Sequence, residues 1–131
     1  MVLQSLYGTE IFGMALEFND TVKKALEISE KIDGIMGDRT VYHEIYDVVH
    51  ENNHYEFKIG FVAYDYFSVV FQYEQGIVDC YIECGDQESI FLVKERGCYS
   101  DTDINDCFSE VKKEIELRIP DKYLVAKGWK V

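Results

Sequence analysis

One short segment constrains the fold of this chain more than any other feature. In YEFKIGF, residues 55–61, every second residue is apolar: Tyr55, Phe57, Ile59 and Phe61. A period of two is that of a β-strand with one face in the core and the other face polar. Such a strand needs a second layer to cover its apolar face.

Three more strands are predicted immediately downstream, at residues 66–74, 77–84 and 89–95. The links between them are short, and the turn sequences EQG and GDQE contain glycine. Consecutive strands joined in this way form an antiparallel meander. The inward positions of its second and third strands are expected to be Phe67, Val69, Phe71, Tyr73, Val78, Cys80, Ile82 and Cys84.

Helices are predicted at both ends of the chain. Residues 19–34 have apolar positions at helical spacing, with Asn19 or Asp20 as the cap and Gly34 or Gly37 as the end. The clearest helical pattern starts at Ile104 and must end before Pro120. A short final helix follows Pro120 and is expected to bring its apolar residues, Leu124 and Trp129, back onto the core.

Residues 39–51 give conflicting signals. Val41, Ile45, Val48 and Val49 fit the helical period, whereas the β-branched and aromatic content favours a strand. We favour helix here. The predicted fold is therefore α+β: a four-stranded antiparallel meander with N-terminal and C-terminal helices packed on one face. Residues 1–131 are expected to form a single domain, with residues 1–13 a candidate for a loose N-terminal arm.

Charge limits the kind of partner. The formal net charge is −12 and the isoelectric point is about 4.5, so the surface repels nucleic-acid phosphate and anionic lipid and favours a basic partner.

No apolar run reaches the roughly 18 residues of a membrane helix. The N-terminus lacks a basic region and carries Glu10 and Glu17, which argues against a signal peptide and for a cytoplasmic protein. The four cysteines form no C-x-x-C pair and are expected to be reduced thiols.

The sequence YSDTDIND begins like a calcium-binding loop. Counting from Asp101 as position one, the first, third and fifth positions are Asp101, Asp103 and Asn105, which carry carboxylate or amide oxygens. The sixth position is Asp106 where glycine is required, and the twelfth is Lys112 where a bidentate glutamate belongs. The acids are better explained as caps of the helix that follows, and no cofactor is expected.

A second constellation is His43, Asp47 and His50. On a helix these residues would share one face, where they could bind zinc with His54 or act as a general acid and base. The sequence places no nucleophile or oxyanion donor near them, and the common phosphate-binding, metalloprotease and hydrolase motifs are absent. A small enzyme or ligand-binding domain that uses these three residues is one alternative function.

Acidic residues cluster in the second half of the chain. Between residues 79 and 106 there are eight acids and two bases, and part of this set shares the outward face of a predicted strand with Tyr81. Aromatic side chains supply anchors in protein interfaces, and carboxylates steer cationic partners. The predicted partner-binding residues are Asp79, Tyr81, Glu83, Asp86, Glu88, Asp101, Asp103 and Asp106.

In size, acidity, lack of catalytic motifs and its aromatic and acidic strand face, the chain resembles the small cytoplasmic immunity proteins of bacterial toxin systems. The resemblance implies a non-enzymatic protein that binds a basic toxin domain, often a nuclease, and blocks its active site. Carboxylates such as Asp79, Glu83 and Asp101 would then occupy a cationic cleft. A further alternative is a homo-oligomeric structural module in which the edge strand SIFLVKE, residues 89–95, pairs between chains.

Overall fold

The computed structural model describes residues 19–93, 97–98 and 104–131. An antiparallel sheet and α-helices make up this part of the chain, which confirms the α+β class. Five strands are neighbours in chain order, and a short β6 (Gly97–Cys98) pairs with β4. The meander therefore has one long strand more than predicted. Its strands are β1 (Thr40–Glu51), β2 (His54–Ala63), β3 (Phe67–Glu74), β4 (Ile77–Glu83) and β5 (Ser89–Phe91).

The extra strand is β1, so the helix predicted for residues 39–51 is wrong. The register of β1 against β2 shifts twice, between Val41 and Glu44 and between Tyr46 and Val49. Each shift is a β-bulge, in which one additional residue is inserted and the alternation of faces changes phase.

The bulges explain why the pattern looked helical. The β1 residues that pack toward the helices are spaced by three, two, three and two positions, which mixes the strand period with a near-helical one. An uninterrupted strand would have kept a spacing of two throughout. The inward residues are Thr40, His43, Ile45, Val48 and His50.

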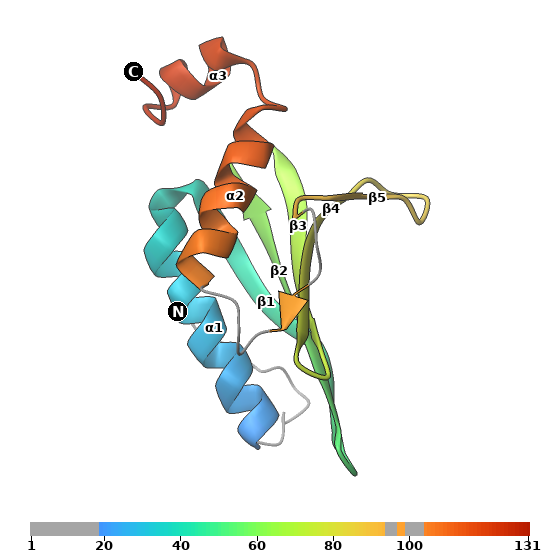
Figure 1. Ribbon diagram of the computed structural model, residues 1–131. Coiled ribbons are helices and arrows are strands. Elements are labelled where there is room, and N and C mark those ends of the chain that lie inside the picture. The colour runs from blue at the N-terminus through green and yellow to red at the C-terminus, as the bar shows by residue number, and fades with distance from the viewer. Residues whose placement is uncertain (1–18, 94–96, 99–103) are drawn as a thin grey trace.

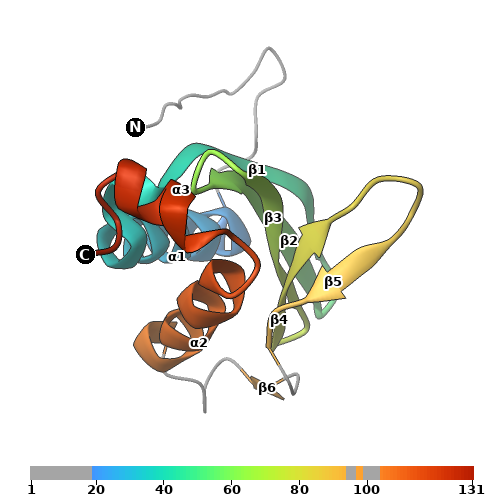
Figure 2. The same cartoon turned by 90° about the horizontal axis from the view of Figure 1, so that it is seen from above.

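Two helices cover the same face of the sheet, α1 (Asp20–Met36) and α2 (Ile104–Glu116), as Figures 1 and 2 show. The predicted cap of α1 is confirmed: Asn19 Oδ1 accepts a hydrogen bond of 2.9 Å from the backbone N–H of Val22. Gly37, with φ of 61°, follows the last residue of α1 and begins a short 3₁₀ turn, η1 (Gly37–Arg39). Left-handed backbone of this kind favours glycine.

The core lies between the helices and the inward faces of the strands. The fully buried ring of Phe108 on α2 has its centroid 6.5 Å from that of Phe61 on β2 and 5.9 Å from that of Phe71 on β3. The predicted inward positions of β3 are buried or pack against this core, and so are those of β2 from Phe57 and those of β4 up to Ile82. Tyr55, at the start of β2, is 38% exposed instead. Cys84 is exposed instead, because β4 ends at Glu83 and the chain leaves the helix-covered part of the sheet.

The C-terminal segment packs on the end of the sheet, as predicted. After α2 ends at Glu116, α3 (Asp121–Ala126) buries Leu124 completely. The ring of Trp129 meets the edge of the buried Tyr64 ring at 5.2 Å between centroids, and its Nε1 donates a hydrogen bond of 3.0 Å to Asp38 Oδ1. These contacts tie the chain end to the turns that precede β1 and β3.

Replacing Phe108 with alanine tests the assignment of the core. Because the ring is fully buried between two other aromatic rings, we expect Phe108→Ala to lower the free energy of unfolding by about 3–5 kcal/mol. The matched control is Leu117→Ala, just past the end of the same helix, where the side chain is 71% exposed and the change should stay within about 0.5 kcal/mol. Urea denaturation measures both, and equal losses would contradict the assignment.

Candidate protein-binding surface

The sheet face opposite α1 and α2, called the open face below, carries the candidate binding residues. Side chains alternate along β2, β3 and β4, so the polar residues between the core positions all point to this face. No described helix lies over it (Figure 2). Among the described strand residues Lys58 is its one lysine. Its carboxylates are those of Glu44, Asp47, Glu51, Glu56, Glu74, Asp79 and Glu83.

An aromatic strip crosses the open face from β1 to β5. The ring of Tyr46 on β1 lies over Gly60 on β2, where a Cβ atom on the glycine would come within 3.2 Å of the ring. Gly60 pairs with Val70, and Val70 pairs with Tyr81. Because the two tyrosines flank it, Val70 is only 1% exposed although it belongs to the open face. The ring of Phe91, 58% exposed, continues the strip at 5.5 Å from the ring of Tyr81.

The phenols of the strip stay protonated well above neutral pH. Partial burial raises the pKa of Tyr46 to about 12, and the nearby carboxylates, Glu83 foremost, contribute in the same direction. Burial also raises the pKa of Tyr81, with Lys58 opposing the change. Tyr81 donates a hydrogen bond of 3.4 Å to Gln72 Oε1. The strip therefore offers apolar ring surface and neutral hydroxyl groups inside a negatively charged frame.

Two carboxylates of the open face oppose each other directly. Glu56 on β2 pairs with Glu74 on β3, and like charges at such a pair of positions destabilise a sheet. His54 forms an ion pair with Glu56, and Gln72 donates a 3.4 Å hydrogen bond to Glu74. The cross-strand pair of carboxylates therefore adds negative charge to the open face and local repulsion to the sheet.

The hairpin between β4 and β5 extends the open face. It projects from the sheet on the side away from the helices (Figures 1 and 2). Its turn contains three consecutive residues with positive φ, at residues 85–87. Glu83, Asp86 and Glu88 are all exposed on it. The hairpin thus carries carboxylates away from the body of the protein, where a partner can reach them.

The predicted binding residues do not all lie on this surface. Tyr81 and Glu83 are on the open face, and Asp86 and Glu88 are on the hairpin. Asp79 belongs to the open face by register but is only 6% exposed, and its Oδ1 accepts a 3.0 Å hydrogen bond from the backbone N–H of Cys80. Asp106 is exposed on α2, on the other side of the sheet, and Asp101 and Asp103 lie outside the described residues.

Several residues of the open face were missed from the sequence. Glu56 and Glu74 can be predicted from the period of two in β2 and β3, because both occupy outward positions of these strands. Glu44 and Tyr46 could not be found in that way, because the bulges in β1 disguise its alternation.

The structure does not bring His43, Asp47 and His50 together. His43 faces α1 and uses both ring nitrogens, at 3.0 Å from Ser29 Oγ and 2.9 Å from Thr40 Oγ1. His50 also faces α1, whereas Asp47 lies on the open face. The shared face expected of a helix is lost because the segment is a bulged strand. Within residues 19–93 and 104–131 no group of three side chains is arranged to hold a metal ion.

Comparison of the chain with protein-family models, with curated proteins and with solved structures finds no match. In the described part of the chain, no helix has the length and apolar character needed to cross a bilayer. The surface itself is therefore the basis for any functional proposal.

His43 should make stability depend on pH. Burial lowers its pKa below the ordinary value of 6.5, although Asp33 opposes the shift, so the folded protein binds a proton less readily than the unfolded chain. The contribution to stability is complete above about pH 6.5 and is lost as the pH falls below that value. We expect the stability advantage of wild type over His43→Gln, measured by urea denaturation, to shrink between pH 7.5 and 5. A constant or growing difference would contradict this.

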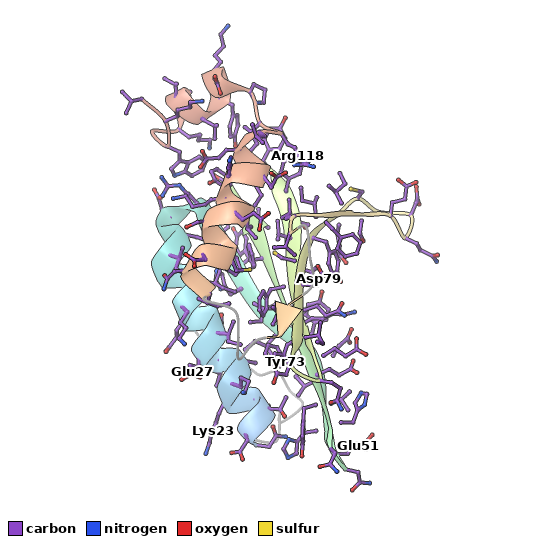
Figure 3. All side chains as sticks on the ribbon, viewed as in Figure 1. Lys23, Glu27, Glu51, Tyr73, Asp79 and Arg118 are labelled. Carbon is purple, nitrogen blue, oxygen red and sulfur yellow. The ribbon has the colours of Figure 1, made fainter. Side chains whose placement is uncertain are left out.

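Glu74→Gln should stabilise the protein. The substitution removes the like-charge interaction with Glu56 and keeps a side chain of the same size, so we expect a gain of about 0.2–1 kcal/mol at low salt. The gain should decrease as added salt screens the repulsion. Glu27→Gln on α1, an exposed site that points away from the sheet (Figure 3), is the control and should show little change. Thermal denaturation at two salt concentrations measures both, and a destabilised Glu74→Gln would exclude the proposed repulsion.

Proposed function

We propose that this protein is a non-enzymatic binding module that captures a basic protein partner on the open face of its sheet. The observation that carries the proposal is the composition of that face among the described strand residues, where seven carboxylates, all but Asp79 at least partly exposed, and one lysine surround the aromatic strip. Aromatic rings that are partly desolvated act as anchors, and carboxylates around them speed the approach of a cationic surface. The formal net charge of −12 acts in the same direction at longer range.

The role that fits best is neutralisation of a toxin domain. Enzymes that cleave nucleic acids carry basic clefts for the phosphate backbone. The projecting hairpin brings Glu83, Asp86 and Glu88 into a position to enter such a cleft. The body of the protein would then block access to the active site. The resemblance in size and charge to cytoplasmic immunity proteins supports this role, and we propose the cytoplasm as its location.

A pair of matched variants tests the proposal. The open-face variant combines Glu44→Gln, Glu74→Gln and Glu83→Gln. The helix-face variant combines Glu27→Gln, Glu30→Gln and Asp33→Asn on the exposed side of α1. Each removes three carboxylates, so the two differ only in where the charge is lost. The partner to assay is a basic protein encoded beside this chain, purified and titrated by calorimetry.

We expect the open-face variant to bind that partner at least about tenfold more weakly, because close carboxylates contribute directly to the complex. The helix-face variant should lose about twofold or less, and wild-type association should slow as salt rises. In cells, wild type and the helix-face variant should suppress the partner's toxicity, and the open-face variant should not. Equal behaviour of the two variants, or a neighbouring protein that is not bound at low salt, would refute the proposal.

A further inference from the structure

We infer that the open face contains a subsite for one arginine side chain of the basic partner, and that Lys58 fills this subsite in the free protein. The inference rests on the proposed function and adds to it the chemistry of the anchoring residue and a specificity determinant. Three groups define the subsite: the ring of Tyr46, the carboxylate of Asp47 and the side chain of Lys58 that lies between them.

The first argument is that the site already holds a cation. Lys58 Nζ lies 3.3 Å from Asp47 Oδ2 and 6.0 Å from the centroid of the Tyr46 ring. A carboxylate and an aromatic face together form a favourable environment for positive charge. The ammonium group of the chain's own lysine therefore shows what kind of group the site accepts.

The second argument is that this occupant is easily displaced. The Asp47 side chain is 61% exposed and that of Lys58 is 32% exposed, and an ion pair that water reaches in this way contributes little to stability. The lysine stem is flexible, so its ammonium group can move into solvent without a change in the backbone. Asp47 itself is held by the second bulge of β1, with φ of 52°.

The third argument selects arginine over lysine as the incoming group. A planar guanidinium stacks on an aromatic ring and makes two parallel hydrogen bonds to a carboxylate, which an ammonium cannot do. Tyr46 and Asp47 are consecutive on β1 and supply a ring and a carboxylate side by side. Arginine is also enriched among the residues that dominate protein interfaces.

The proposed subsite makes Lys58 a competitor of the incoming arginine side chain. Removing Lys58 should therefore strengthen the binding of an arginine-containing peptide. The probes are two nine-residue peptides, all arginine and all lysine, titrated against the full chain by calorimetry at low salt. Wild type should prefer the arginine peptide by about fivefold, and Lys58→Gln should bind it about fivefold more tightly than wild type does.

Two controls separate a local effect from a change in total charge. Lys113→Gln on the exposed side of α2 removes the same charge far from the open face and should alter affinity by less than about twofold. Asp47→Asn keeps a residue that tolerates the left-handed backbone and should reduce the preference for arginine to about twofold or less.

The outcomes distinguish this inference from the proposed function. If Lys58→Gln matches Lys113→Gln, or if Asp47→Asn keeps the full arginine preference, the subsite is refuted. The proposed function would still stand in that case if the open-face variant, with Glu44, Glu74 and Glu83 neutralised, weakens both peptides. If that variant binds both peptides as tightly as the helix-face variant does, the proposed function fails as well.

Discussion

The packing of Phe108 against Phe61 and Phe71 is the contact on which the rest of the structure depends. It joins α2 to two central strands and so determines which face of the sheet the helices cover. Because side chains alternate along each strand, burying one face commits every second residue to the other. The acidic and aromatic surface proposed as the binding site consists of those remaining positions. The register of the strands therefore determines both which residues form the core and which residues form the site.

The bulges of β1 connect the edge of the sheet to the site. They place Tyr42 and Asp47 in left-handed backbone and change the faces of the residues that follow. Bulges on an edge strand also discourage pairing with another chain. That makes β1 a poor edge for the homo-oligomeric alternative and leaves the short, exposed β5 as its candidate. The opposed carboxylates of Glu56 and Glu74 show a second compromise, since they weaken the sheet while adding charge to the open face.

The sequence predicted the fold wherever local pattern and tertiary environment agree. Within β2, β3 and β4 the pairing has no register shift, and the ends of α1 follow from Asn19 and Gly37, so these elements were found. Residues 39–51 failed because two inserted residues, which only pairing with β2 reveals, changed the spacing of the inward side chains. The site was found in part for the same reason: Tyr81 and Glu83 lie on a regular strand, whereas Tyr46 and Glu44 lie on the bulged one.

The most direct test of the central claim, that the open face is the contact surface, is mapping of the complex by backbone amide chemical shifts. On titration with the basic partner we predict that the largest changes occur in β1 to β4 at residues 44–47, 58–60, 70–72 and 81–83, and in the hairpin at residues 85–88. The exposed residues of α1 and α2 should change little. Large changes confined to the helices, with the open face unaffected, would contradict the account.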